Sequence, residues 1–196
     1  EALSHANLLW RSFSHWIGGM GVLVFILAIL PMTGGSTLNL MKAESPGPSV
    51  SKLVPKVRST AILLYCIYIV FTALEVVFLI VGGMNIFEAL TLSFGTAGTG
   101  GFGILNSSIG SYSPYVQYVI TVFMIIFGIN FNLYYLILTK KICSALKSEE
   151  LWTYIGIVIV STAVIALNIH STFGSDSLRT SAFQVASIIS TTGYAS

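Results

Sequence analysis

Long apolar stretches, nearly free of charged residues, are the feature that most restricts how this chain can fold. A helix needs roughly 18 to 20 apolar residues to cross the hydrocarbon core of a bilayer. Only 8% of the 196 residues are charged, against roughly 25% in soluble domains, so a soluble globule could not cover its surface. The chain is therefore predicted to be an all-α polytopic membrane protein with four spans: Phe13–Leu30, Ala61–Val81, Tyr115–Leu138 and Leu151–Ile169.

The basic residues predict which ends of the spans face the cytoplasm. Seven of the nine Lys and Arg residues lie in two connecting segments, 31–59 and 139–150. Cytoplasmic loops of membrane proteins carry an excess of Lys and Arg, so both segments are expected inside the cell, and 82–114 and 170–196 outside. The formal net charge of +2 is too small to suggest nucleic acid as a partner.

Residues 86–95 are apolar but too few to span a membrane. A helix of this length measures about 15 Å, half of the ~30 Å hydrocarbon core. The chain must then return through irregular backbone, which is tolerated at membrane depth only where protein buries it or a water-filled cavity receives it. A re-entrant pore helix is therefore predicted for 86–95, and a second one for 178–190.

The chain repeats its architecture at an offset of 92 residues. This shift places Gly82 on Gly174 and aligns TGGFG at 99–103 with TTGYA at 191–195. Side-chain identity between the halves is low, so the predicted repeat depends on equal spacing, equal topology and this shared turn. Each unit is expected to consist of a span, a pore helix, a turn and a second span.

Both turns resemble TVGYG, the string whose carbonyl oxygens replace the water shell of potassium in potassium channels. Aiming consecutive carbonyls at one axis requires backbone angles that favour glycine. Neither turn contains a charged side chain, which suits a weakly hydrated monovalent ion, and the C-terminal ends of the pore helices favour a cation. The residues predicted to coordinate potassium through backbone carbonyls are Thr99, Gly100, Gly101, Phe102, Thr191, Thr192, Gly193 and Tyr194.

These segments predict the organisation of the whole chain. The first part comprises the closing helix of a preceding pore unit (1–30) and a cytoplasmic loop (31–59). A complete unit (60–138) follows, with spans at 61–81 and 115–138, a pore helix at 86–95 and a filter at 96–103. A second cytoplasmic loop (139–150) leads to a truncated unit (151–196), with a span at 151–169, a pore helix at 178–190 and a filter at 190–195.

Four strings carry a resemblance to a known family and together cover nearly the whole chain: SHWIGGMGVLVF (14–25), ESPGPSVSKLVPKVRSTA (44–61), GTGGFG (98–103) and STTGYAS (190–196). With them the sequence resembles the Trk/Ktr family of potassium uptake proteins, in particular its TrkH-type pore subunits. The resemblance implies four pore units in one polypeptide around a pseudo-fourfold axis, of which this chain would be an internal fragment. It also implies one key glycine per filter, here Gly101 and Gly193. Gly100 and Ala195 depart from the family pattern, which expects a bulkier residue and a second glycine.

The same resemblance implies a location and partners. It implies potassium uptake across the cytoplasmic (inner or plasma) membrane of a prokaryote, by a homodimer in contact with membrane lipid. The dimer would dock a cytoplasmic, TrkA-like nucleotide- or NAD-binding regulatory subunit, and the basic segments 40–58 and 140–147 face that side. No covalently bound cofactor is expected, and potassium is the transported ion.

Two other functions remain as alternatives. A secondary transporter that couples potassium to sodium or protons by alternating access also contains broken helices, and a non-transporting membrane scaffold would need no filter. An enzyme is not expected, because the sequence offers no nucleophile with a base and no paired carboxylates. The pattern GxGxxG at 98–103 lacks the strand, helix and acidic residue of a dinucleotide site.

Two polar features lie inside the predicted spans. Glu75 is the one carboxylate well inside a span, and intramembrane acids are functional candidates; a pore-lining role and an interhelical hydrogen bond both stay open. Asn130 and Asn132 lie in the middle of the third span and are expected either to join helices or to touch a water-filled cavity.

Overall fold

The computed structural model describes residues 3–21 and 57–196. The secondary structure of these residues is helical, as predicted: α1 (His5–Gly19), α4 (Val57–Val81), α5 (Ile86–Ala97), α6 (Pro114–Gly128), α7 (Phe131–Leu138), α8 (Ile142–Leu146), α9 (Glu149–Phe173) and α10 (Ser177–Ile189), with a 3-10 turn at Gly174–Asp176. The predicted loop 31–59 lies outside the described residues, except for 57–59, which already belong to α4.

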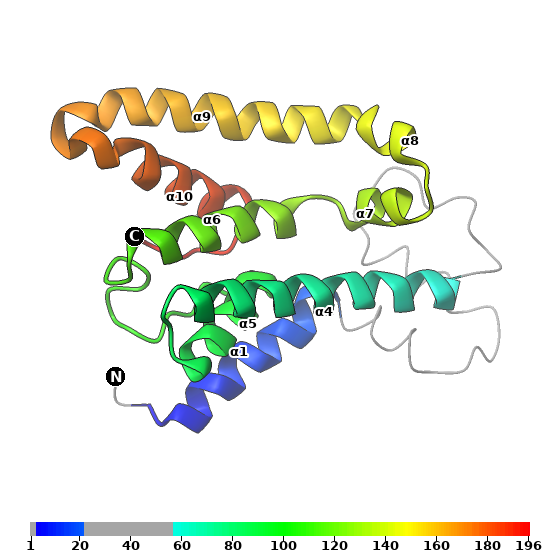
Figure 1. Cartoon of the computed structure of the whole chain (residues 1–196), viewed down its shortest axis with the longest axis horizontal. Helices are drawn as coiled ribbons and strands as arrows, with labels where there is room; N and C mark the ends of the chain where they lie inside the picture. Colours follow the sequence, from blue (N-terminus) through cyan, green and yellow to red (C-terminus); the bar gives the residue numbers. More distant parts are fainter. Residues whose placement is uncertain (1–2, 22–56) are drawn as a thin grey trace.

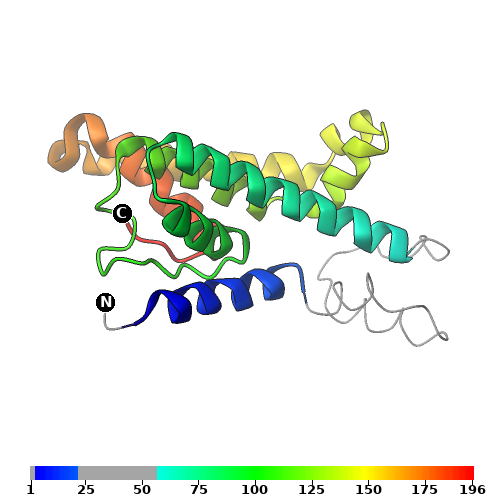
Figure 2. The same ribbon diagram turned by 60° about the horizontal axis from the view of Figure 1, so that its bottom comes forward.

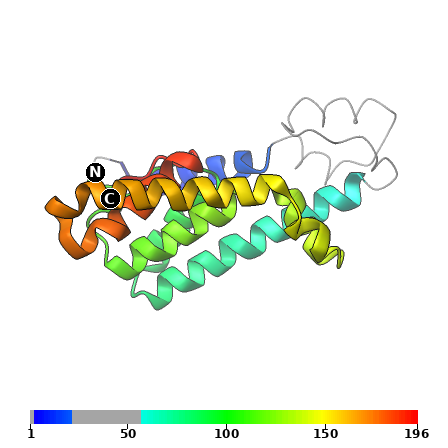
Figure 3. The ribbon, with the colours of Figure 1, turned by 90° about the horizontal axis from the view of Figure 1, so that it is seen from above.

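The two long helices α4 and α9 have 25 residues each, and they begin and end 92 residues apart. In Figures 1 and 3 they run in the same direction along the long axis of the molecule. Each leads through a tight connection into a shorter helix, α5 or α10. Two described helical segments, one of them running from α9 into α10, are long and apolar enough to cross a membrane, and α6 with α7 would make a third.

The helices α1 and α6 are shorter, 15 residues each, and run opposite to α4 and α9 (Figures 1 and 2). Both begin after a serine, Ser4 or Ser113, whose side chain accepts a hydrogen bond from a backbone N–H three residues on. Such N-caps partner one of the free N–H groups of the first turn. α1 packs on α5, which has 12 residues, and α6 packs on α10, which has 13.

The first predicted span, Phe13–Leu30, overlaps only the second half of α1. The helix begins eight residues earlier, at His5, because Ser4 caps it there. Hydropathy did not indicate this start, since the first turns of the helix are polar. It ends at Gly19, and Gly21 has a φ of 81°. Residues 22–30 of the predicted span lie outside the described residues.

The third predicted span, Tyr115–Leu138, is divided between two helices rather than formed by one continuous helix. α6 ends at Gly128, α7 begins at Phe131, and the two helices are bent by 84°. Asn130 caps α7 by accepting a hydrogen bond from the N–H of Asn132 at 3.0 Å. Asparagine breaks a helix here because its side chain offers the backbone a competing partner.

The basic segment 139–150 contains the short helix α8. Lys140, Lys141 and Lys147 are all exposed. In Figure 1, α7 and α8 lie at the end of the molecule where α9 begins, away from the connections that follow α4 and α9. The three lysines are thus gathered at one end of the helical body.

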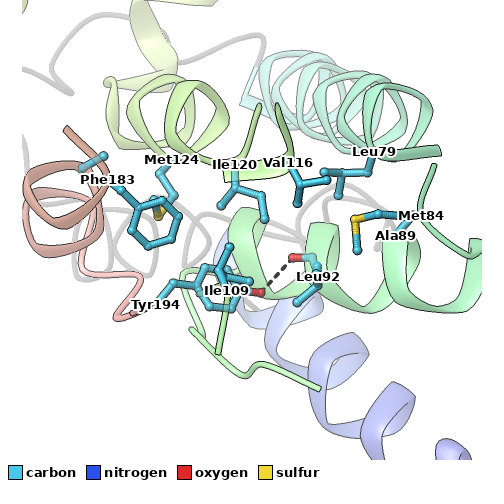
Figure 4. Close-up of a cluster of buried hydrophobic side chains, with 11 residues drawn as sticks. Leu79, Met84, Ala89, Leu92, Ile109, Val116, Ile120, Met124, Phe183 and Tyr194 are labelled. Atoms are coloured by element: carbon cyan, nitrogen blue, oxygen red, sulfur yellow. Dashed lines mark hydrogen bonds between the residues drawn. The ribbon is translucent and has the colours of Figure 1, made fainter. Parts of the chain in front are cut away.

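One apolar core joins the two halves of the described chain. Its residues come from α4, α5, α6 and α10, from the connection between α4 and α5, and from the connections that follow α5 and α10 (Figure 4): Leu79, Met84, Ala89, Leu92, Ile109, Val116, Ile120, Met124, Phe183, Ala186 and Tyr194. Because Phe183 and Tyr194 of the second half are buried among residues of the first, the halves pack as one body.

Glycines let α1 approach the end of α5 closely. A Cβ on Gly19 would lie 2.7 Å from the Cα of Gly98 and 2.6 Å from the hydroxyl oxygen of Tyr68. That hydroxyl donates to the carbonyl oxygen of Trp16 at 2.9 Å. Small residues permit such close helix packing in membranes, and α1 is thereby held against both α4 and α5.

Candidate functional site

Two turns follow α5 and α10, and their backbones are alike. Both helices end with the same pair of backbone hydrogen bonds, again 92 residues apart. The left-handed region is entered at Thr99 (φ 52°) and Gly101 (φ 63°) in the first turn, and at Thr191 (φ 59°) and Gly193 (φ 83°) in the second. In both turns, two residues with left-handed backbone are therefore separated by one residue with negative φ.

Positive φ has a different meaning at the two positions. For a β-branched residue such as Thr99 or Thr191 it is a genuine outlier, and left-handed backbone costs about 1–2 kcal/mol with a Cβ. Such conformations persist only where the surroundings enforce them, and they cluster at functional sites. At Gly101 and Gly193 the same angles carry no steric cost.

The two turns touch each other. A Cβ added to Gly101 would collide with the carbonyl oxygen of Thr192. Beyond this contact, the N–H of Ile109 donates to the carbonyl oxygen of Ala195 at 2.9 Å, and the N–H of Ala195 donates to the hydroxyl of Ser108 at 3.2 Å. The structure therefore brings together the two groups of residues that the sequence predicts as ligands.

The carbonyl oxygens of the turns fall into two groups. In the part of the chain that the structure describes, no donor binds the carbonyls of seven of the eight predicted residues, all except Tyr194. Tyr194 differs because its carbonyl accepts a hydrogen bond from the Ser187 hydroxyl at 2.6 Å. Folded proteins normally partner their backbone carbonyls, and consecutive unpartnered carbonyls are the ligands that potassium filters offer.

The Tyr194 side chain locks the second turn to the first half of the chain. It is 2% exposed, and its hydroxyl donates to the carbonyl oxygen of Leu92 on α5 at 3.0 Å (Figure 4). A Cβ on Gly95 would collide with this hydroxyl. Gly95 thus provides the space that the tyrosine occupies.

Phe102, the aromatic residue of the first turn, is held by two side chains of α1. The guanidinium carbon of Arg11 lies 4.7 Å from the ring centroid, and the His15 ring meets Phe102 edge-on with centroids 4.8 Å apart. Arg11 Nη2 also donates to the carbonyl oxygen of Gly103 at 3.0 Å. The space that a bulkier residue would need at Gly100 is filled by His15 and Phe102.

Sequence reasoning missed Arg11 and His15 as site residues. Nothing in the turns points to them, because they lie about 90 positions earlier in the chain, and Arg11 precedes the predicted span, which begins at Phe13. One signal was present: a spacing of four residues puts both side chains on one face of a helix.

Glu75 and Asn130, the polar residues inside the predicted spans, have different surroundings. Glu75 is completely buried in α4, where the Thr96 side chain of α5 lies next to its carboxylate at a geometry too poor for a full hydrogen bond. It therefore does not line an open surface of the described part. Asn130 donates to both carboxylate oxygens of Glu150, at 3.3 and 3.2 Å, in addition to capping α7.

The electrostatics around the turns come from dipoles more than from charges. The C-terminal ends of α5 and α10, which carry partial negative charge, adjoin the turns. Among residues 3–21 and 57–196, no three His, Cys, Asp or Glu side chains group as metal ligands. Burial raises the pKa of Tyr112, in the connection after the first turn, to about 12, with the Glu88 carboxylate adding to the rise; its phenol is therefore neutral at physiological pH.

The fold and the apolar helices define an all-helical membrane protein. A family model described as "TrkH: Cation transport protein" matches residues 1–155. The chain therefore belongs to the TrkH family of cation transport proteins, which confirms the resemblance seen in the sequence.

Similar proteins agree with this assignment. The chain is 33% identical to the Trk system potassium uptake protein TrkH of Escherichia coli K12, over 99% of this chain and 42% of that protein. It is 31% identical to TrkG of the same organism, over 83% of this chain and 35% of that protein. The crystal structure of the potassium transporter TrkH from Vibrio parahaemolyticus matches with a TM-score of 0.71 and 28% identity, over 95% of this chain and 38% of that chain. The chain spans less than half the length of these relatives.

Proposed function

We propose that this chain forms part of a pathway that carries potassium into the cell across the cytoplasmic membrane, and that its two turns contribute backbone carbonyls to the selectivity filter. The observation that carries the proposal is the pair of matched turns. They share left-handed positions 92 residues apart, they touch at Gly101 and Thr192, and seven of their predicted ligand carbonyls have no donor among the described residues.

The chemistry of the turns favours a monovalent cation. Fixed carbonyl oxygens can replace the water shell of potassium and still release the ion, whereas carboxylates would hold it more strongly. The negative ends of α5 and α10 add to the attraction without adding a full charge. Potassium in particular is supported by the relatives, which are named potassium uptake proteins.

The helix arrangement supports two consecutive pore units. In the first, α4, α5, the turn 99–103 and α6 follow one another; in the second, α9, α10 and the turn 191–195 do so at a constant offset. We propose that the short helices α5 and α10 are the pore helices, and that further units in the complete protein close a pseudo-fourfold ring around the ion.

Serine substitutions at the two key glycines test this function in the complete protein. At positive φ, an added Cβ costs about 1–2 kcal/mol of backbone energy, which is a factor of roughly 5–30 in an equilibrium. Gly101→Ser and Gly193→Ser should therefore lower the preference for rubidium over sodium by about that factor, or abolish uptake. Rubidium uptake with sodium as competitor, in cells that lack their own potassium uptake, measures the preference.

Gly174→Ser is the matched control for Gly193→Ser. Both glycines have positive φ, and a Cβ at either would meet no atom within 4 Å. Gly174, however, lies before α10, whereas the second turn follows α10. The control should keep the wild-type preference. If both filter variants reach the membrane and match wild type in rate and sodium inhibition, the turns are not the filter. Uptake that disappears without a sodium or proton gradient would favour a coupled transporter instead.

Family membership also supports partners. We propose that the complete protein is a homodimer and that a cytoplasmic, TrkA-like nucleotide-binding subunit binds the end of the molecule at which Lys140, Lys141 and Lys147 are exposed. This end would then face the cytoplasm, as the positive-inside rule predicts.

A further inference from the structure

The end of the first turn, residues 101–104, is held to the protein differently from the end of the second turn, residues 194 and 195. In the second turn, Tyr194 and Ala195 make four hydrogen bonds, through both backbone groups of Ala195 and through the carbonyl and hydroxyl of Tyr194. In the first turn, the backbone of residues 101–104 makes one hydrogen bond within the described part of the chain, from Arg11 to the carbonyl of Gly103.

Phe102 explains why the first turn needs an external partner. Tyr194, at the equivalent place in the second turn, anchors itself through its hydroxyl. Phe102 has no hydroxyl and can be held only through its ring. The Arg11 guanidinium lies over this ring at 4.7 Å, within the range of a cation–π interaction.

We propose that Arg11 is a positioning residue for the filter, which clamps the outer end of the first turn from a helix of the preceding unit. The inference rests on the proposed function, because it concerns how the turn keeps its carbonyls in place. Arg11 binds Gly103 and Phe102, directly after the free carbonyls of residues 99–101, and does not use those carbonyls itself.

Arginine suits this task for two physical reasons. Its planar guanidinium can donate to a carbonyl and stack on an aromatic ring at once, which the ammonium group of lysine does less well. A hydrogen bond from a charged donor is also stronger than a neutral one. Arg11 makes no ion pair within the described residues, and its Nη2 donates to the turn, while its Nε is buried without a partner there.

The test compares arginine variants in the complete protein, in cells that lack their own potassium uptake. Arg11→Gln removes the charge and shortens the side chain, so the turn should loosen. Sodium should then inhibit rubidium uptake at a concentration lower by about tenfold or more, as expected for loss of a charge-assisted hydrogen bond. Arg11→Lys should lie between Arg11→Gln and wild type. The inhibition constant for sodium does not depend on how much protein reaches the membrane, whereas a merely structural role would change only that amount.

Arg179→Gln is the matched control. Arg179 lies near the start of α10 and pairs with Asp176 at 3.1 Å. Among the described residues it makes no hydrogen bond to either turn, so its variant should keep the wild-type inhibition constant. A second comparison uses Phe102→Leu. If Arg11 acts through the ring, the effects of Arg11→Gln and Phe102→Leu should be clearly less than additive, because each removes the same contact.

The outcomes separate this inference from the proposed function. If the filter glycine variants alter selectivity but Arg11→Gln has the wild-type constant, Arg11 is not a positioning residue and the filter stands. If the glycine variants also match wild type, the proposed function fails as well. Should Arg11→Gln not reach the membrane, Arg11→Lys decides: a severalfold shift supports the clamp, and a wild-type constant contradicts it.

Discussion

At the scale of single residues, the contact between Gly95 and Tyr194 predicts a coupled pair. Gly95→Ala would drive a methyl group into the tyrosine hydroxyl, and overpacking of this kind costs about 1–3 kcal/mol. Tyr194→Phe loses one hydrogen bond, about 1 kcal/mol, but removes the colliding oxygen. Thermal unfolding in detergent should therefore show that the double variant is more stable than Gly95→Ala alone.

Gly156→Ala in α9 serves as the control for this pair, because a Cβ there meets no atom within 4 Å. It should leave the unfolding temperature unchanged or raise it slightly, since alanine favours a helix more than glycine. A double variant no more stable than Gly95→Ala would mean that the hydroxyl is not what fills this space.

The residues of the candidate site could be predicted from sequence only where backbone chemistry sets the residue type. Glycine in the turns is recognisable because positive φ restricts the choice, so Gly101 and Gly193 were predicted. Arg11 was not predicted. It contacts a carbonyl oxygen, which every residue has, and a ring, which several residue types could supply, so neither partner indicates it in the sequence. The carbonyl of Tyr194 could not be distinguished from its neighbours either, since the Ser187 hydroxyl reaches it only in the folded turn.

At the scale of helices, the joint between α6 and α7 depends on Asn130. Asn130→Ala removes the cap of α7 and both hydrogen bonds to Glu150; loss of such a cap costs about 0.5–2 kcal/mol. Asn130→Asp keeps the cap but places a second carboxylate beside that of Glu150, so it should lower stability by charge repulsion. Adding Glu150→Gln should remove this repulsion and restore stability. Thermal unfolding of the purified protein in detergent measures all of these variants.

Asn132→Ala is the control at this joint, because only the backbone N–H of Asn132 takes part in the cap. It should unfold near the wild-type temperature. Equal destabilisation by Asn130→Ala and Asn132→Ala would show that the amide of Asn130 does not maintain the bend.

The bend also marks the limit of hydropathy as a guide to helices. The long apolar helices α4 and α9 overlap the predicted spans 61–81 and 151–169, because an average over many apolar residues is insensitive to single positions. The same averaging hid the break, since the residues from Phe127 to Phe131 are apolar apart from Asn130. A cap is a local hydrogen bond, and a sliding average does not detect it.

At the scale of the whole molecule, the exposed lysines at one end predict where the proposed TrkA-like subunit would bind. Neutralising Lys140, Lys141 and Lys147 to glutamine in the complete protein should weaken the pull-down of a TrkA-like partner, since complementary charge supports such contacts. The difference in pull-down between wild type and this variant should be larger at low salt than at high salt, because salt screens exposed charges.

Cys143 provides the control for insertion, because it is exposed in the same segment. With Cys66 replaced by serine, a membrane-impermeant thiol reagent should label Cys143 only in permeabilised cells, in wild type and lysine variant alike. Unchanged pull-down with this labelling pattern would restrict the three lysines to setting the topology.

The bend between α6 and α7 has a consequence for the surrounding lipid. At 1.5 Å per residue, α4 and α9 are about 37 Å long and α6 only about 22 Å, less than the ~30 Å hydrocarbon core. A hydrophobic segment that is too short for its bilayer is accommodated by local thinning of the bilayer. This thinning costs a modest free energy for each ångström of mismatch. With α6 and α7 as one bent span, we expect a thicker bilayer to favour straightening of the joint at Asn130 and a thinner one its bend. Membrane thickness and a single hydrogen-bonded cap would then act on the same angle.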